Sequence, residues 1–149
     1  MGKLNIPRYY RYYQTNAFQL KPEPNENDVA TVSIQMALMK DGEGDWENTK
    51  IHFQFKPEDE LTDLCCFMIG IKSKLELSGH GKSNNKQLSM TRNENQSIYV
   101  CLKEGAQSYT IVLPATSAWH LGVISINQLR HRFSITFNEA MNMLRMIKL

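Results

Sequence analysis

The stretch from Lys86 to Leu113 constrains the fold most strongly, because its apolar and polar residues alternate in three short segments. A period of two places successive side chains on opposite faces of a β-strand. The segments read LSMTR, SIYVCLK and SYTIVL, and the connections contain residues 93–96 and Lys103-Glu104-Gly105. Asparagine and glycine favour tight turns between antiparallel strands. The stretch therefore predicts a β-meander.

The alternation predicts an apolar inner face and a polar outer face for this meander. The inner face would carry Leu88, Met90, Ile98, Val100, Leu102, Tyr109, Ile111 and Leu113. The outer face would carry Gln87, Ser89, Thr91, Ser97, Tyr99, Cys101, Lys103, Ser108 and Thr110. This outer set contains neither Asp nor Glu. A broad β surface without carboxylates suits an anionic partner, and its absence of acids is the main indication of function.

Three segments upstream of the meander also have the composition of strands. Residues 8–20 are rich in aromatic side chains, and residues 30–40 alternate, with Val32, Ile34, Met36 and Leu38 on one face. Residues 49–56 alternate as well, with Ile51, Phe53 and Phe55 inward and with Lys50, His52, Gln54 and Lys56 outward. Polar connections are predicted for residues 21–28 and 41–48. The outward side of the third segment again lacks acids.

Two helices and a C-terminal helical segment are predicted from apolar spacing. Pro57 followed by three acidic residues favours a helix start, and an apolar stripe extends from there to Leu75. Residues 114–117 offer a cap for a second helix over residues 118–131. Residues 134–149 have apolar side chains at helical spacing. The predicted order is therefore strands followed by a helix, twice, over residues 8–75 and 76–133.

Length and composition bound the class of protein. A chain of 149 residues fits one domain over 1–149, and the pattern predicts an α+β fold of antiparallel sheets with two helices. The formal net charge is only +2, but most of the acidic residues lie outside the predicted strands. No apolar run is long enough to span a membrane, and the three cysteines lack disulfide or zinc spacing. These features predict a cytoplasmic protein that is not membrane-bound.

The sequence shows no constellation that would indicate catalysis. The histidines His52, His80, His120 and His131 have no metal-ligand spacing, and no nucleophile elbow or paired-carboxylate motif is present. The GHGKS stretch at residues 79–83 contains only part of a phosphate-binding loop and precedes a strand rather than a helix. We therefore predict a protein that is not an enzyme and that has no cofactor and no metal site.

Two successive units of strands closed by a helix, with a polar, acid-free and aromatic-bearing outer sheet face, resemble the Whirly fold and the related single-stranded-DNA-binding transcriptional coactivator fold. The resemblance covers residues 8–133 by element order, and the KGKAAL signature of plant Whirly proteins is missing. It implies that the helices mediate packing between units, that protomers form oligomers such as tetramers, and that single strands lie along exposed sheet surfaces.

The residues and the resemblance together predict a non-enzymatic protein that binds single-stranded nucleic acid, above all DNA, with little sequence preference, in replication, recombination, repair or transcription. Phosphate neutralisation and base stacking would provide the binding. The candidate binding residues are Lys50, His52, Lys56, Lys82, Lys86, Arg92, Tyr99, Lys103, Tyr10, Arg11 and Tyr12. The alternatives are RNA binding and a protein-interaction or assembly module that uses the same sheet face.

Two features leave the arrangement of partners and faces open. Alternation places Tyr10 and Tyr12 on one face of their strand and Arg11 on the other, so only one set is exposed. Ala118, Gly122 and Ser125 form a line of small residues on the second helix, which permits close approach of another backbone. We expect a homo-oligomer, a dimer or a tetramer, that assembles through its helices.

Overall fold

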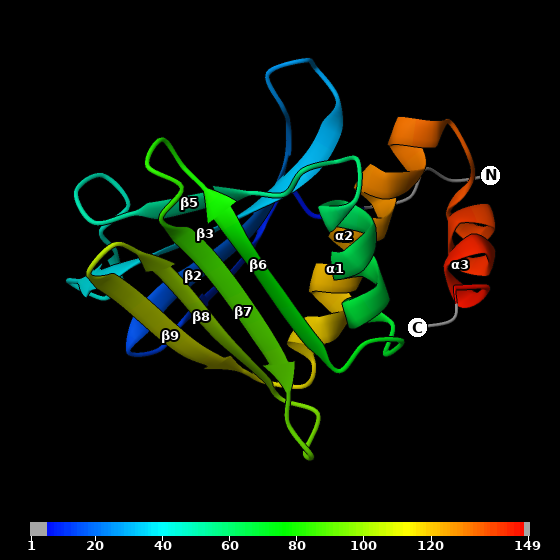
Figure 1. Ribbon diagram of the computed structural model, residues 1–149. Helices are drawn as coiled ribbons and strands as arrows, with labels where there is room; N and C mark the ends of the chain where they lie inside the picture. The colour runs from blue at the N-terminus through cyan, green and yellow to red at the C-terminus, as the bar shows by residue number, and fades with distance from the viewer. Residues whose placement is uncertain (1–5, 148–149) are drawn as a thin grey trace.

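The computed structural model describes residues 6–147 and contains two antiparallel β-sheets and three helices (Figure 1). The first sheet comprises β1 (Tyr10–Tyr13), β2 (Asn16–Pro24), β3 (Ala30–Lys40), β4 (Glu43–Gly44) and β5 (Ile51–Gln54). The second comprises β6 (Lys74–His80), β7 (Lys86–Arg92), β8 (Ile98–Glu104) and β9 (Gln107–Leu113). The helices are α1 (Glu60–Met68), α2 (Ser117–Phe133) and α3 (Phe137–Arg145).

The order of elements confirms an α+β chain in which strands are followed by a helix, twice. The first sheet precedes α1, the second sheet precedes α2, and α3 follows. The C-terminal helix begins at a capping box, in which Thr136 and Glu139 each accept a hydrogen bond from the other's backbone N–H. Such boxes stabilise helix starts by satisfying free N–H groups. The helical segment predicted for 134–149 thus forms a distinct helix within the described residues.

The meander is confirmed and has one strand more than predicted. β7, β8 and β9 pair in sequence order, and the predicted inner-face residues are all buried. The fourth strand, β6, contains Leu75, which the apolar spacing had assigned to the first helix. Helix α1 instead ends at Met68, and Gly70 follows with a φ of 87°. Glycine adopts this left-handed conformation at little steric cost, so the chain turns there toward β6.

The N-terminal region is a hairpin rather than the single strand predicted for residues 8–20. β1 pairs antiparallel with β2, in a register that places Tyr10 opposite Leu20 and Tyr13 opposite Ala17. β2 also continues to Pro24, through part of the segment predicted as a connection. Beyond Leu20, β1 no longer covers β2, so Pro22 and Pro24 lie on a free edge, where proline is tolerated.

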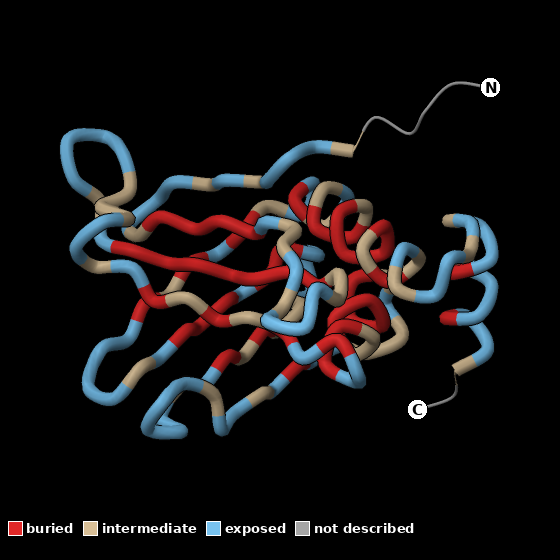
Figure 2. Tube along the Cα trace, turned by 90° about the horizontal axis from the view of Figure 1, so that it is seen from above, coloured by how far each residue is buried: buried red, intermediate tan, exposed pale blue. Residues whose placement is uncertain are grey.

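One hydrophobic core joins both sheets and all three helices. Phe18, Ile34 and Phe53 from the first sheet, and Val100 from the second, are fully buried in it. Figure 2 shows the buried residues concentrated in the paired strands and the helices, with exposed residues in the connecting loops. Within residues 6–147, no helix is sufficiently long and apolar to cross a membrane.

Candidate nucleic-acid interface

The outer face of the second sheet is a solvent-exposed polar surface, and no helix crosses it in Figure 1. Cross-strand pairing places Lys74, Thr91, Tyr99 and Val112 in one row. The Tyr99 side chain is 38% exposed and that of Val112 is 41% exposed. Because every residue of this row shares one face, an exposed aromatic ring lies beside a lysine and a hydroxyl on a surface open to a ligand.

A second row on this face contains its one carboxylate among the described strands. Glu76, Ser89, Cys101 and Thr110 are aligned by the same pairing. Because β6 was not predicted as a strand, Glu76 was not among the predicted outer-face residues, which contained no Asp or Glu. The Glu76 carboxylate forms an ion pair with Lys74, with Oε1 2.9 Å from Nζ. The charge on Glu76 is therefore balanced by its neighbour on β6.

A shallow hollow of about 530 Å3 lies over the same rows. Its walls include Glu76, Ser78, Gln87, Ser89 and Lys103. Cys101 lies at its base, only 9% exposed, and its Sγ is 3.7 Å from Ser108 Oγ. Besides Glu76, the polar groups of the hollow are the Gln87 amide, the hydroxyls of Ser78 and Ser89 and the Lys103 ammonium. These groups are hydrogen-bond donors suited to phosphate and base edges.

The first sheet also has a polar face, but the polar side chains at its centre are buried. We call this surface the polar face of the first sheet. The strand pairing aligns Arg11, Gln19, Gln35 and His52 across β1, β2, β3 and β5. Arg11 Nε donates to Gln19 Oε1 at 2.5 Å, and Gln19 Nε2 donates to Gln35 Oε1 at 3.2 Å. Gln19 and Gln35 are each only 5% exposed. The centre of this face is thus satisfied internally rather than by solvent.

The chain of hydrogen bonds ends at Glu23. Gln35 Nε2 donates to Ser33 Oγ at 3.3 Å, and Ser33 Oγ donates to Glu23 Oε1 at 2.5 Å. Gln54 Nε2 donates to Glu23 Oε2 at 2.5 Å, and His52 Nε2 lies 3.1 Å from the same oxygen. Burial alone would raise the pKa of Glu23. The hydrogen bonds and the charge of His52 outweigh burial and lower the pKa from 4.5 to about 2.

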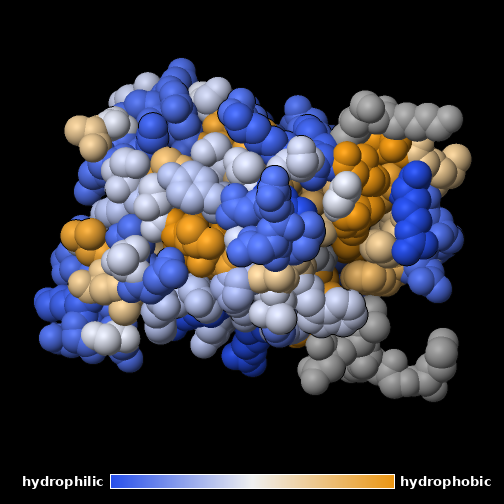
Figure 3. Space-filling view, turned by 90° about the horizontal axis from the view of Figure 1, so that it is seen from below, coloured by the Kyte–Doolittle hydropathy of each residue, from blue (hydrophilic) through white to orange (hydrophobic). Residues whose placement is uncertain are grey.

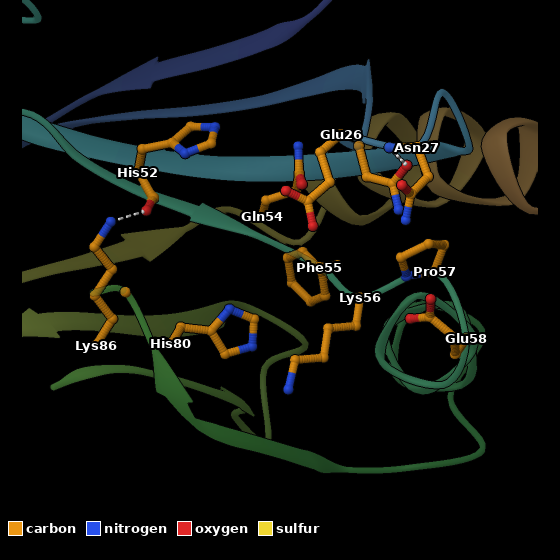
Figure 4. Close-up of a pocket in the computed structure, with 12 residues that line it drawn as sticks. Glu26, Asn27, His52, Gln54, Phe55, Lys56, Pro57, Glu58, His80 and Lys86 are labelled. Atoms are coloured by element: carbon orange, nitrogen blue, oxygen red, sulfur yellow. Dashed lines mark hydrogen bonds between the residues drawn. The ribbon is translucent and has the colours of Figure 1, made fainter. Parts of the chain in front are cut away.

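A cleft of about 540 Å3 separates β5 from the turn between β6 and β7 (Figure 4). It brings together three of the predicted site residues, His52, Lys56 and Lys86. Lys86 Nζ donates to the backbone carbonyl of His52 at 2.7 Å and thereby bridges the two sheets. The walls of the cleft also carry Glu26 and Glu58, so the cleft has mixed charge.

His80, which sequence patterns did not assign a role, forms the wall of the cleft on the side of the second sheet. Its ring stacks on Phe53 with centroids 4.0 Å apart, and its Nε2 lies 2.8 Å from Glu60 Oε2. Glu60 Oε1 also accepts a hydrogen bond from the backbone N–H of Lys56 at 2.8 Å. The His80 side chain therefore connects β6, β5 and the start of α1, and stabilises the cleft.

Arg92 faces inward, contrary to its predicted place on the nucleic-acid surface. It continues the buried side of β7, and its Nη2 donates to the carbonyl of Phe67 at 2.7 Å. The guanidinium also lies over the Phe67 ring, 5.0 Å from the centroid. Desolvation by burial lowers the pKa of Arg92. Its charge stabilises the C-terminal carbonyls of α1, where the helix dipole is negative.

The tyrosines of β1 are divided between the two faces of the first sheet. The ring of Tyr10 stacks on His120 with centroids 4.9 Å apart, and its hydroxyl is 2.6 Å from Ser117 Oγ. Tyr10 and Tyr12 pack against the core, which corrects their proposed exposure, whereas Tyr9 and Tyr13 are exposed with Arg11. Of the two faces of this strand, the exposed one is therefore the face that carries Arg11.

The remaining predicted cations are exposed in or beside loops. Lys50 precedes β5, Lys56 follows it, and Lys82 lies in the turn between β6 and β7. Lys103 lies on the outer face of the second sheet, four residues beyond Tyr99 on the same strand. Of the predicted residues, Tyr99 and Lys103 therefore lie on this outer face, His52, Lys56 and Lys86 line the cleft, and Arg11 lies at the edge of the first sheet.

The small-residue line on α2 is covered by the chain at Ser125, whereas Ala118 and Gly122 border a groove. A Cβ added at Gly122 would lie 3.7 Å from Met68 Cβ of α1, and Ser125 is fully buried. Beside it, an apolar groove of about 630 Å3 is lined by Met68, Trp119 and Met141 among others. Figure 3 shows hydrophobic side chains concentrated at this helical end of the molecule. Trp119 is 74% exposed there.

Comparison with known proteins adds no assignment. No model of a known protein family matches the chain, and no curated protein sequence matches it. Within residues 6–147, no group of three or more His, Cys, Asp or Glu side chains is arranged to hold a metal ion.

Proposed function

We propose that the protein binds single-stranded nucleic acid, most favourably DNA, without catalysing a reaction. The observation that carries the proposal is the outer face of the second sheet, which exposes Tyr99 and Lys103 and pairs its Glu76 with Lys74. A base stacked on an exposed aromatic ring contributes about 1–3 kcal/mol. Lysines that neutralise phosphates add a term that does not depend on sequence.

The hydrogen-bonding groups around Tyr99 fit a ligand of low sequence specificity. The rows on this face present the hydroxyls of Ser89, Thr91 and Thr110 and the amide of Gln87. Uncharged donors and acceptors of this kind can contact sugars, phosphates and base edges alike. In our proposal the strand runs across β7, β8 and β9, with bases on Tyr99 and phosphates toward Lys103.

The proposal includes a Whirly-like arrangement. It is supported by the order of elements, with strands followed by a helix twice, and by an outer sheet face left open by the helices. In the proposed assembly, copies of the chain associate through their helical ends into a dimer or tetramer. The exposed Trp119 and the neighbouring apolar groove support this part of the proposal.

Fluorescence anisotropy of a labelled oligothymidine tests the function directly. We expect saturable binding at low salt, with an observed association constant that falls linearly with salt concentration on a double logarithmic plot. Competition with duplex DNA and with RNA of one sequence then determines which nucleic acid is preferred. Failure to bind, or binding independent of salt, would refute the proposal and favour a protein-interaction module that uses the same face.

A further inference from the structure

The edge of the first sheet holds a guanidinium between two aromatic rings. The Cζ atom of Arg11 lies 4.5 Å from the ring centroid of Tyr9 and 5.5 Å from that of Trp46. Both distances are within the range of cation–π attraction. Trp46 comes from the loop between β4 and β5, far from Arg11 in sequence, so the cluster exists only in the folded chain.

The position of Trp46 is fixed by the backbone beneath it. A Cβ added at Gly44 would lie 2.7 Å from Ala17 Cβ and 2.7 Å from Trp46 Cε2. No side chain fits in that space, so the indole lies directly against the glycine of β4, and Ala17 of β2 closes the other side of that glycine. The indole beside Arg11 therefore packs on the backbone of β4, although Trp46 itself belongs to the following loop.

The guanidinium is held from a third direction by the hydrogen-bonded polar face. Arg11 Nε donates to Gln19 Oε1 at 2.5 Å, and Gln19 is in turn held by Gln35. Within residues 6–147, no hydrogen bond or ion pair engages the two terminal nitrogens of Arg11. An arginine whose plane is fixed while its outer N–H groups are free is preorganised to contact an anion with two hydrogen bonds.

Charges of both signs surround the cluster. Lys21 is exposed on the same face of β2 as Gln19, and Arg8 is exposed just before β1. Asp45 and Glu47 flank Trp46 in the loop. The ion pairs found among residues 6–147 do not include Arg11. Arg8 and Lys21 therefore add positive charge that would attract a polyanion, while the Glu23 charge further along β2 is engaged by Ser33, His52 and Gln54.

We propose that Tyr9, Arg11 and Trp46 form a second contact site for a single strand, distinct from the outer face of the second sheet. Arg11 would bind a backbone phosphodiester through its terminal nitrogens, and a neighbouring base would stack on Tyr9, which is 47% exposed. This inference rests on the proposed function. It adds the residues Tyr9 and Trp46, and it gives the strand a contact on each sheet.

The two tryptophans of the chain provide a paired test. Trp119→Phe leaves Trp46 as the sole tryptophan, and Trp46→Phe leaves Trp119 at the helical end. Each variant is titrated with oligothymidine while tryptophan emission and the anisotropy of a labelled oligothymidine are recorded. We expect Trp46 emission to change in parallel with anisotropy, because the ligand binds the guanidinium that covers its ring. Trp119 emission should stay constant.

The outcomes separate this inference from the proposed function. A rise in anisotropy without a change in Trp46 emission would overturn the second site and leave the proposed function standing. Absence of any rise in anisotropy would refute both. Circular dichroism of each variant verifies that the fold is intact before titration.

Charge variants at Arg11 give an independent measurement. Arg11→Gln should weaken oligothymidine binding by about three- to tenfold and reduce the salt slope by about 0.7, the contribution of one phosphate on a single strand. Arg11→Lys should restore the salt slope but not the full affinity, because an ammonium cannot reproduce the planar fork. Arg145→Gln, on the exposed end of α3, should change neither. Unchanged affinity and slope in Arg11→Gln would contradict the proposal.

Discussion

The two sheets each carry a polar face, and the two faces use their polar groups in opposite ways. On the first sheet, Gln19, Gln35 and Ser33 are buried and hydrogen-bonded to one another, and the network ends at Glu23. On the second sheet, Tyr99 and Lys103 are exposed. An absence of acids along a strand therefore does not by itself identify a binding surface. The surface must also leave its donors unpaired within the chain.

Among the variants that test this comparison, Glu23→Gln is expected to reduce stability most, because it removes the charge to which the polar network on the first sheet is hydrogen-bonded. Ser33, His52 and Gln54 all direct polar groups at the Glu23 carboxylate. Breaking a buried charged hydrogen-bond network while leaving its partners in place costs about 2–4 kcal/mol. Urea denaturation should show a loss of that size in the free energy of unfolding.

Glu76→Gln is the matched control on the second sheet. The Glu76 carboxylate is 65% exposed and its ion pair with Lys74 is open to solvent. Exposed pairs contribute little, so the free energy of unfolding should change by less than about 0.5 kcal/mol. Similar losses in the two variants would show that the two faces do not differ in the way described.

The pH dependence of stability sharpens the same contrast. The pKa of Glu23 is about 2 in the folded chain, below its ordinary value of 4.5. Its contribution to stability is therefore fully present above pH 4.5 and is lost as pH falls toward about 2. We expect the stability difference between wild type and Glu23→Gln to shrink over that interval in urea titrations. A stability difference between the two proteins that is unchanged near pH 2 would contradict the low pKa of Glu23.

Tyr99→Ala should affect binding and spare the fold. Loss of one stacked base is expected to reduce the free energy of oligothymidine binding by about 1–3 kcal/mol. Val112→Ala, in the same row and equally exposed, removes apolar surface without removing a ring that can stack. Anisotropy titrations should show a clear loss only for Tyr99→Ala. Equal losses would indicate general apolar contact, as expected for a protein partner.

The second sheet was largely predictable because its information is local. Alternation from Leu88 to Leu113 identifies the buried inner face, although Ser97 and Cys101 of the predicted outer set are buried as well. The turns between strands contain asparagine and glycine. The same alternation places Arg92 on the inward side with Met90. Its assignment to the binding surface followed from its charge rather than from its position. Strict alternation along this strand would have excluded Arg92 from the predicted binding surface.

The first sheet was less predictable because its arrangement depends on contacts between distant segments. The prolines at 22 and 24 indicate a connection when read locally, yet β2 accepts them where β1 no longer covers it. That extension brings Glu23 onto the polar face. Nothing near Trp46 in sequence indicates that it packs on Gly44 beside Arg11. The apolar residues up to Leu75 continue the helical spacing, so the sequence predicted a longer first helix. The chain instead turns at Gly70.

Lys103→Gln is expected to have the smallest effect on binding and tests the electrostatic part of the open face. Lys103 is exposed on β8, so removing its charge should remove about one phosphate contact and reduce the salt slope by about 0.7. At moderate salt the affinity should fall by about two- to fivefold, with the same proportional loss for different sequences. Lys72→Gln is the control, because Lys72 Nζ is paired within the chain, 3.4 Å from Asp63 Oδ1 of α1. An equal change of slope in both variants would assign the salt dependence to net charge, and the open face would then have no particular part in it.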